Sequence, residues 1–386
     1  MKKIISILTA TRAEYGLLKP IMSKLNKIEE YDIRLVVTGM HLSPDYGLTF
    51  KEIIQDGFTI DRKIDIILSS GTSVAVTKSM GLALISFAEY FDELKPNLLI
   101  VLGDRYESFA VCCAAMNARI PIAHLHGGEV TEGVIDEAIR HSITKMSYLH
   151  FTSTEEYRKR VIQLGEHPNR VFNVGAIGLE VIKELNYMSK EEFEKSINFT
   201  ISKKLALLTF HPVTLEDNTE EQFENILQAI DMFDDIQVII TKANADAGGN
   251  VINKLIDEYV KKRSNKCVAF ESLGQLRYLT AMKYCDFVIG NSSSGIIETP
   301  SFKKPTINIG DRQKGRIQAK SIINCKPIKL EIVSSIEKAL SVDFRKTLDD
   351  LEDPYGDGNV SDNIVSEINR FLNQNLLSIK KQFYNL

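Results

Sequence analysis

The chain has 386 residues, of which 44% are hydrophobic and 25% are charged, so it is long enough for two globular domains with sizeable cores. Its formal net charge of -4 gives no basic surplus of the kind that binds nucleic acid or an anionic membrane. The five cysteines lack C-x-x-C spacing, and no apolar stretch approaches the roughly 18 residues of a membrane helix, so buried thiols and a cytoplasmic location are expected.

Short apolar runs alternate with longer amphipathic segments along the whole chain. The runs are rich in β-branched residues and mostly lack strict alternation, which is typical of strands buried on both faces. In chain order they are 4–8, 33–37, 98–102, 120–125, 149–151, 171–175, 205–210, 237–241, 267–271, 287–290 and 305–310. Helical patterns lie between them, for example at 17–30, 220–233 and 251–263. This alternation predicts parallel sheets flanked by helices.

The number of predicted strands is too large for one compact sheet, so two α/β domains are expected. We place the first at residues 1–178 and the second at 179–361, with a hinge near 176–188. The amphipathic pattern of 362–381 predicts a final helix, and we expect the segment 362–386 to pack back on the first domain.

Polar or glycine-rich residues follow the strands in both halves, and ligands of open parallel sheets bind outside the carboxyl ends of the strands. The segments concerned are TATRAEYG with Arg12 and Glu14, GDRYE at 103–107, HLHGGE at 124–129, HPVT at 211–214, NSSSG at 291–295 and DRQKGR at 311–316. Two such edges facing each other would form a polar cleft between the domains.

The NSSSG segment lies between a strand and a helix pattern, so its N–H groups and hydroxyls can hold a phosphate, although a simple N-cap explains the serines as well. Arg12 and Arg312 are candidate partners for a diphosphate, against the ordinary alternative of surface arginines. No P-loop, dinucleotide-binding or zinc-binding pattern is present, so neither a cofactor nor a metal is expected.

The segment 135–146 has the pattern of a helix with Asp136 and Arg140 four residues apart, as in an ordinary surface ion pair. The glycine pair at 127 and 128 favours a functional interpretation, because glycines let a ligand approach the backbone. The same stretch brings Glu129 and Asp136 toward one strand end.

Taken in order, GDRYE, HLHGGE, DEAIRHSITKM, HPVT, GNSSSGIIE and NIGDRQKGR resemble the hydrolysing UDP-N-acetylglucosamine 2-epimerases of bacterial sialic and legionaminic acid biosynthesis, across essentially the whole chain. The resemblance implies two Rossmann-like, doubly wound domains facing across a cleft, as in the GT-B fold. It also implies a reaction on a UDP-sugar in which elimination of UDP gives a glycal and water addition yields N-acetylmannosamine. A homodimer or homotetramer without cofactor or metal is the expected assembly.

The resemblance assigns Asp104 and Asp136 as catalytic carboxylates, positioned by Arg105 and Arg140. Its UDP-contacting positions are Arg12, His211, Ser292, Ser293, Glu298 and Arg312. His126 stands where the family commonly has a glutamate, and one extra residue lies between Glu129 and Asp136. Either His126 or Glu129 is therefore expected to supply the second acid–base group.

Three other functions remain open from the sequence. The substrate can instead be UDP-N,N'-diacetylbacillosamine, as on the legionaminic acid route. A GT-B glycosyltransferase would share the nucleotide site but would also admit an acceptor, and a nucleotide-sugar sensor would need no acid–base groups. The dense carboxylates beside the glycine pair favour proton abstraction from a sugar carbon.

Overall fold

The computed structural model describes residues 2–68, 72–130, 135–212, 218–243, 249–356, 358–377 and 379–386. Two parts of the predicted motifs, 131–134 in the candidate catalytic stretch and 213–214 in HPVT, lie outside these residues. The chain divides into two compact units. Unit 1 holds the described residues up to Val130, 135–181 and Tyr355–Leu386, and unit 2 holds Ile182–Pro354.

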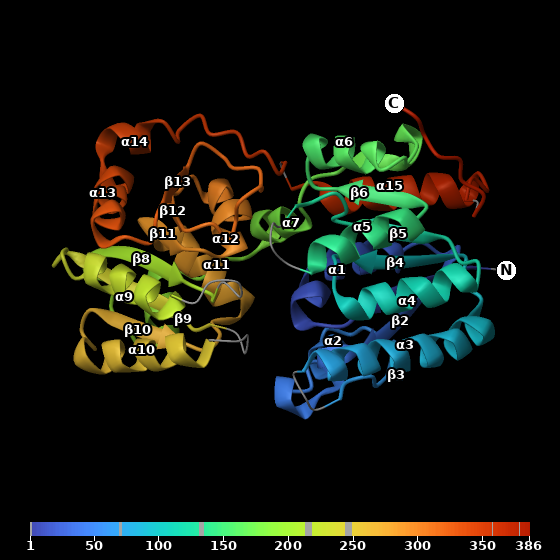
Figure 1. The fold of residues 1–386 in the computed structure, drawn as a ribbon, viewed down its shortest axis with the longest axis horizontal. Coiled ribbons are helices and arrows are strands. Elements are labelled where there is room, and N and C mark those ends of the chain that lie inside the picture. The colour runs from blue at the N-terminus through green and yellow to red at the C-terminus, as the bar shows by residue number, and fades with distance from the viewer. Residues whose placement is uncertain are drawn as a thin grey trace. The chain divides into compact units, whose positions relative to one another are not determined.

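Unit 1 alternates strands and helices along the chain (Figure 1). Its elements are β1 (Lys3–Thr9), α1 (Arg12–Leu25), β2 (Tyr31–Thr38), η1 (Gly39–Leu42), η2 (Pro44–Tyr46), α2 (Phe50–Gln55), β3 (Ile60–Ile64), α3 (Ser73–Leu94), β4 (Leu98–Leu102), α4 (Tyr106–Asn117), β5 (Ile122–Leu125), α5 (Asp136–Met146), β6 (Leu149–Thr152), α6 (Glu155–Gln163), η3 (Pro168–Arg170), β7 (Val171–Asn173) and α15 (Val360–Asn373). Helix α7 (Ile177–Glu184) contains the boundary between the units.

Unit 2 repeats the same alternation with its own sheet. Its elements are α8 (Lys190–Ile197), β8 (Lys204–Thr209), α9 (Thr219–Ile230), β9 (Ile236–Thr241), α10 (Gly249–Lys262), β10 (Cys267–Phe270), α11 (Gly274–Tyr284), β11 (Phe287–Gly290), α12 (Ser293–Ile297), η4 (Thr299–Phe302), β12 (Thr306–Ile309), β13 (Ile322–Cys325), α13 (Lys329–Leu340) and α14 (Val342–Lys346).

Both sheets are parallel and share one topology. The strand order is β3-β2-β1-β4-β5-β6-β7 in unit 1 and β10-β9-β8-β11-β12-β13 in unit 2. In each sheet the chain first adds strands to one side of its first strand and then adds the remaining strands to the other side, so the order reverses between β1 and β4 and between β8 and β11. This is the 3-2-1-4-5-6 arrangement of nucleotide-binding α/β domains. The predicted class of two Rossmann-like α/β domains is therefore confirmed.

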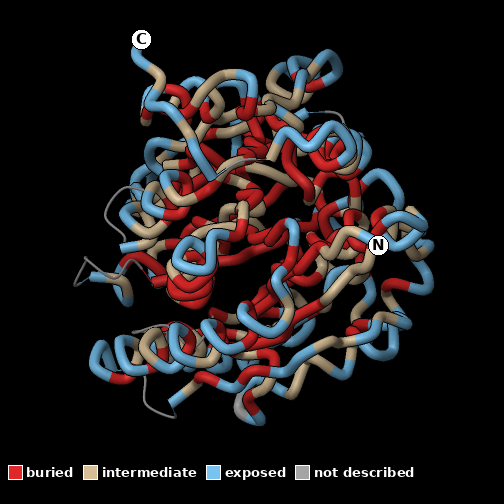
Figure 2. Tube along the Cα trace, turned by 90° about the vertical axis from the view of Figure 1, so that its right-hand side faces the viewer, coloured by how far each residue is buried: buried red, intermediate tan, exposed pale blue. Residues whose placement is uncertain are grey.

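Each sheet is buried on both faces because helices cover both of them. Alternate residues of a strand point to opposite faces, so they belong to different cores. In β4, Leu98 and Ile100 join the core under α1 and α15, whereas Leu99 and Val101 join the core under α3 and α4. Figure 2 shows the same arrangement along the trace, with buried residues on the strands and exposed residues on the outer sides of the helices. The strands of unit 2 are covered in the same way by α9, α10 and α13 on one face and by α8 and α11 on the other.

Two strands lie outside the predicted set, and both are edge strands. The β3 sequence, IDRKI, carries three charged residues, and β13 is half exposed, so neither forms an apolar run. Helix α1 begins at Arg12 rather than at 17, because Thr11 and Glu14 form a capping box. The final helix, α15, ends at Asn373 and not at 381, and 379–386 continues without helix.

Helix α3 corrects one expectation from the sequence. Within the described residues it is the single helix long and apolar enough to cross a membrane by length and composition. Phe87, Tyr90 and Phe91 of this helix are buried in the core of unit 1, and a core helix can have the same length and composition.

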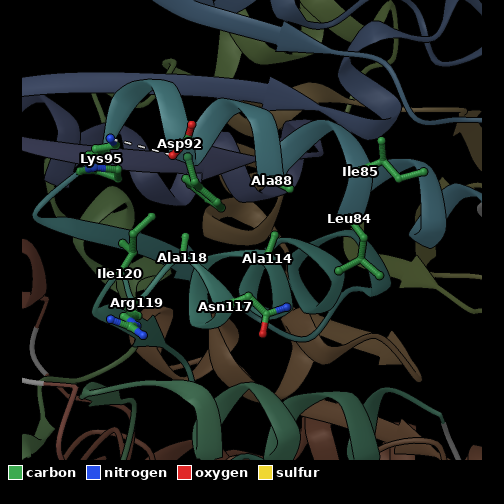
Figure 3. Close-up of a pocket in the computed structure, with 12 residues that line it drawn as sticks. Leu84, Ile85, Ala88, Asp92, Lys95, Ala114, Asn117, Ala118, Arg119 and Ile120 are labelled. Atoms are coloured by element: carbon green, nitrogen blue, oxygen red, sulfur yellow. Dashed lines mark ion pairs between the residues drawn. The ribbon is translucent and has the colours of Figure 1, made fainter.

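A groove of about 780 Å³ lies between α3 and the C-terminal part of α4, with Leu84 and Ile85 at one end and the Asp92–Lys95 ion pair at the other (Figure 3).

Gly290 ends β11 where the sheet of unit 2 reverses its order, and its φ of 132° is one that side chains rarely adopt. A Cβ atom there would lie 1.9 Å from the carbonyl oxygen of Thr209 on β8. Gly310 also has a positive φ, 71°, but a Cβ atom there would meet nothing within 4 Å.

These two glycines form a matched pair for urea unfolding. Gly310→Ala should cost about 1–2 kcal/mol, which is the penalty for the left-handed conformation alone. Gly290→Ala should cost about 1–3 kcal/mol more, because overpacking adds to that penalty. Equal losses in the two variants would contradict a close approach of β8 and β11.

Candidate active site

The predicted site residues lie at the carboxyl ends of the strands, around the point where each sheet reverses its order. In unit 1 the strands at this point are β1, which leads into Arg12, and β4, which leads into Asp104 and Arg105. In unit 2 they are β8 and β11, which lead into His211 and Ser292. Ligands of doubly wound sheets bind at such points, so each unit has one candidate site region.

Arg140 joins three segments of the unit 1 region. Its side chain is 3% exposed, and its guanidinium pairs with Asp104. The Nη1 atom also donates to Glu137 Oε2 at 2.6 Å and to the carbonyl oxygen of Glu129 at 2.8 Å. A buried arginine needs such partners because it cannot lose its charge. The residue after β4, the loop after β5 and the first turn of α5 are therefore tied together.

His126 and Glu129 form a hydrogen-bonded pair in the loop after β5. The His126 Nε2 atom accepts the N–H of Ile177 at 3.4 Å, so the ring proton lies on Nδ1. Nδ1 is 3.2 Å from Glu129 Oε1, which also accepts a hydrogen bond from Ser153 Oγ at 3.0 Å. The structure thus brings the two alternative acid–base candidates into contact, with the buried glutamate fixing the tautomer of the histidine.

The glycine pair meets a packing requirement of the loop after β5. A Cβ atom on Gly127 would lie 3.0 Å from His124 Nδ1, and one on Gly128 would lie 2.4 Å from the carbonyl oxygen of Tyr157. Gly128 also has a positive φ of 80°. Because protein atoms lie where a Cβ atom would be, the packing of the loop is sufficient to require both glycines. They allow the loop to pack against β5 and α6.

Asp136 is the first residue of α5, as predicted, and is half-buried. Burial raises the pKa of Asp136, and the neighbouring Asp104 raises it further, against the opposing effect of Arg140. From the sequence, the start of a helix and the nearby Arg140 favour the ionised form of Asp136. Arg140 does act in that direction, but burial and Asp104 outweigh it, so the net shift of the pKa is upward. The bonds of Arg140 to Asp104 and Glu137 take the place of the predicted Asp136–Arg140 pair, whereas the Glu137–His141 pair is present at 3.0 Å.

Two further carboxylates belong to this edge, and no role was predicted for either. Glu107 is fully buried and accepts hydrogen bonds from Arg105 at 2.9 and 3.2 Å. Glu14 Oε2 accepts the N–H groups of Ala10 at 2.8 Å and of Thr11 at 3.2 Å. Burial raises the pKa of Glu14 to about 7. The T-x-x-E pattern at 11–14 indicates from the sequence that Glu14 caps a helix. The burial of the Glu14 side chain depends on the fold and has no local sequence signal.

Arg12 begins α1 at the same edge. Its side chain is 51% exposed, and its Nε atom pairs with Glu52 Oε2 at 3.0 Å. Arg12 is thus a solvent-facing cation at the carboxyl end of β1, unlike the buried Arg140.

In unit 2, Asn291 is the centre of the candidate nucleotide region. Its side chain accepts the N–H of His211 at 2.8 Å and donates to the carbonyl oxygen of His211 at 2.8 Å. The carbonyl oxygen of Asn291 accepts hydrogen bonds from Arg312 at 3.1 Å and from Gln313 at 2.8 Å. The strand ends that carry His211, Ser292 and Arg312 are thereby joined. Asn291 stands in the NSSSG motif, but its positioning role was not predicted.

Ser292 is the N-cap of α12 and accepts the N–H of Ser294 at 3.3 Å, and Ser293 is the first residue of the helix. The capping explanation of the serines therefore holds for Ser292. Glu298 lies at the other end of α12 and accepts a hydrogen bond from the Ser294 hydroxyl. Burial raises the pKa of Glu298.

The sequence-predicted residues thus form two groups, one on each unit. Unit 1 carries Arg12, Asp104, Arg105, His126, Glu129, Asp136 and Arg140, and unit 2 carries His211, Ser292, Ser293, Glu298 and Arg312. Among the described residues, no group of three histidine, cysteine, aspartate or glutamate side chains is arranged to hold a metal ion.

The fold and the two groups define an α/β protein of two Rossmann-like domains, with one candidate site region at the strand ends of each. The family model of UDP-N-acetylglucosamine 2-epimerase matches residues 23–369. The chain therefore belongs to the UDP-N-acetylglucosamine 2-epimerase family, and its relatives indicate the hydrolysing type.

Three known proteins illustrate this membership. The GDP/UDP-N,N'-diacetylbacillosamine 2-epimerase (hydrolyzing) of Campylobacter jejuni is 43% identical over 346 residues, which is 89% of each chain. The polysialic acid biosynthesis protein P7 of Escherichia coli is 40% identical over 388 residues, covering 100% of this chain and 98% of P7. The UDP-GlcNAc 2-epimerase of Neisseria meningitidis, solved with UDP-GlcNAc, has the same fold, with a TM-score of 0.81, 18% identity and coverage of 95% of this chain and 100% of that one.

Glu14 makes stability depend on pH in a defined direction. Because its pKa is 4.5 in an ordinary environment and about 7 here, the folded protein holds a proton that the unfolded chain releases between these values. The free energy of unfolding should therefore fall as pH rises from 4.5 to about 7, by at most about 1.4 kcal/mol per pH unit from this group.

Glu14→Gln should remove this contribution, since glutamine is neutral throughout. Urea unfolding of both proteins at closely spaced pH values measures the difference, with Glu30→Gln on the surface as the control. Parallel stability–pH curves for wild type and Glu14→Gln would show that Glu14 is ionised in the folded protein.

Proposed function

We propose that this enzyme is a hydrolysing 2-epimerase that acts on UDP-N,N'-diacetylbacillosamine and releases UDP and the free 2-epimer of the sugar. The observation that carries the proposal is the cluster of Asp104, Asp136 and the His126–Glu129 pair around the buried Arg140. The 43% identity to the Campylobacter enzyme supports this sugar. UDP-N-acetylglucosamine is the second candidate, favoured by the description of the family model that matches residues 23–369.

The proposed reaction begins when a carboxylate takes the proton from C2 while the C1–O bond to UDP breaks, which leaves a C1–C2 double bond. Water then adds its hydroxyl at C1, and C2 receives a proton from the opposite face. Asp136 is suited to proton exchange because its raised pKa lies closer to neutral pH than that of a free aspartate. Asp104, paired with Arg140, is the second carboxylate at the same strand end.

The His126–Glu129 pair is proposed as the second acid–base group. Glu129 holds the Nδ1 proton of His126 and would stabilise the imidazolium form when Nε2 gives up the 3.4 Å hydrogen bond from the Ile177 N–H and takes a proton instead. This arrangement replaces the single glutamate of many family members with a histidine and a buried carboxylate. It unites the two alternatives that the sequence left open.

We propose that the unit 2 group holds the UDP of the same substrate. Arg312 supplies charge for the diphosphate, and the N–H groups at the start of α12 are hydrogen-bond donors beside it. No step requires a metal or a redox cofactor.

A substrate panel in heavy water tests the proposal. Purified protein is incubated separately with UDP-N,N'-diacetylbacillosamine, UDP-N-acetylglucosamine and GDP-N-acetylglucosamine, without acceptor. We expect nucleotide release with deuterium at C2 of the product, and the highest kcat/KM for the diacetamido sugar. A higher kcat/KM for UDP-N-acetylglucosamine would select the second candidate.

Two other results would reject the epimerase itself. Release of the unepimerised sugar without C2 deuterium would indicate a glycosyltransferase that hydrolyses its donor slowly. Tight nucleotide-sugar binding without any turnover would indicate a sensor.

A double-mutant cycle tests the His126–Glu129 pair. His126→Asn should lower kcat by about 10²- to 10⁴-fold, because it removes an acid–base group, and asparagine tolerates the positive φ of 65° at this position. If the pair acts as one unit, His126→Asn/Glu129→Gln should be no more than about threefold slower than His126→Asn alone. Independent losses that multiply would contradict the pair.

Ser153→Ala is the matched control for this cycle. It removes the other hydrogen bond to Glu129, at 3.0 Å, but leaves the contact between Glu129 and His126 in place. Its kcat should stay within a few-fold of wild type.

A further inference from the structure

The segment that follows α15 is anchored on unit 1 at the end of α5 opposite to the candidate site. The Lys381 ammonium group donates to the carbonyl oxygens of Lys145 at 2.6 Å and Ser147 at 2.7 Å, and to Glu166 Oε1 at 2.8 Å. The Tyr384 N–H donates to the carbonyl oxygen of Gly165 at 2.9 Å. The segment thus crosses from the end of α5 to the turn after α6, where the C-terminus lies in Figure 1.

Lys381 uses its whole hydrogen-bonding capacity in this contact. An ammonium group has three N–H donors, and each has an acceptor within 2.8 Å. Ser147 is the C-cap residue of α5, so two of the acceptors are carbonyl groups at the helix C-terminus. Such carbonyls lack partners inside the helix, and the helix dipole favours a cation beside them. Lys381 therefore caps α5 across a separation of 234 residues.

The third acceptor, Glu166, is the centre of a buried charge cluster. Besides Lys381, it pairs with Lys145 at 2.6 Å and with His150 Nε2 at 3.2 Å. Although burial opposes it, the hydrogen bonds from His150 and the two lysines lower the pKa of Glu166 to about 2. An ionised carboxylate without solvent needs these donors, so Lys381 links α5 to β6 and to the segment after α6.

The cluster holds α5 and β6, and both elements continue to candidate catalytic groups at the other edge of the unit. Helix α5 carries Asp136 and Arg140 in its first turns, and β6 leads into Ser153, which binds Glu129. Over the 11 residues of α5, a small tilt at its C-terminal end moves Asp136 relative to Asp104. A displacement of about 1 Å in a catalytic constellation can cost about 10²-fold in rate.

We propose that Lys381 is a positioning residue, which fixes the direction of α5 and thereby the spacing of the carboxylates at its other end. The inference rests on the proposed function where it is tested by turnover, but its test by hydrogen exchange of α5 does not depend on that function. A purely stabilising contact would lower the melting temperature and leave the turnover of folded enzyme unchanged.

The test uses the full chain with Lys381→Met, which keeps the length of the side chain but loses its charge and its donors. At a temperature where the variant is folded by circular dichroism, kcat should fall about 10- to 100-fold. KM and UDP affinity should change less than about twofold, because the proposed UDP-binding residues lie mainly on unit 2. Lys381→Arg should recover most of kcat, since a guanidinium can still donate to the carbonyls and to Glu166. Gln382→Ala, an exposed neighbour in the same segment, should match wild type.

Hydrogen exchange provides a readout that does not require turnover. Amides of α5 should exchange at least about tenfold faster in Lys381→Met than in Gln382→Ala. If Lys381→Met is unfolded at the assay temperature, Phe383→Ala replaces it, because the Phe383 ring lies over Lys145 Nζ at 5.1 Å and packs against Gly165. A smaller loss of kcat and faster α5 exchange are then expected.

Unchanged kcat together with unchanged α5 exchange in a folded variant would overturn the positioning role. Faster exchange with unchanged kcat would also overturn it, because the contact would then only stabilise the helix. An inactive wild type would reject the proposed function instead, and α5 exchange would still decide whether Lys381 holds the helix.

Discussion

The buried guanidinium of Arg140 constrains the candidate catalytic edge of unit 1. An arginine keeps its charge at any physiological pH, and removing that charge from water costs several kcal/mol unless charged or polar partners replace the water. Here the partners are Asp104, Glu137 and the carbonyl oxygen of Glu129, which come from three different segments. Movement of any of the three would cost the buried Arg140 charge one of its partners. The spacing of the proposed acid–base groups is therefore set by several segments of unit 1 together and not by one loop.

The two units carry different kinds of side chain on the same topology. At the reversal of the unit 1 sheet the groups are ionisable and close enough to change one another's proton affinity, as Asp104 does for Asp136. At the reversal of the unit 2 sheet the centre is the neutral side chain of Asn291, which joins strand ends through uncharged hydrogen bonds. Proton transfer benefits from coupled titratable groups, whereas a nucleotide site requires fixed donors. Ionisable groups in unit 1 and fixed hydrogen-bond donors in unit 2 are consistent with the reaction proposed for this protein.

The fold was predictable where local sequence and tertiary environment agree. Interior strands such as β4 form uninterrupted apolar runs because both faces are covered, and Asp136 was placed correctly at the start of α5. The edge strand β3 was missed because one side of it faces solvent and tolerates charge. The direction of the Asp136 pKa shift was missed for a related reason, since burial beside Asp104 is set by segments far apart in sequence. The purpose of Gly128 likewise depends on Tyr157 of α6, which no local pattern identifies.

The return of α15 to unit 1 has a consequence for the order of folding. Ile364 and Ile368 of α15 pack in the core that contains Leu18 and Ile21 of α1, and the Tyr31 hydroxyl donates to Asn369 across 338 residues. A ribosome completes unit 2 before it makes α15, so the hydrophobic surface of α1 has no permanent cover during most of translation. Closing so long a loop also carries a large entropic cost before the contact forms. The nascent first unit is thus expected to depend on chaperones while α15 is missing. If translation stops early, we expect the incomplete unit to be degraded, whereas the finished domain covers its own core.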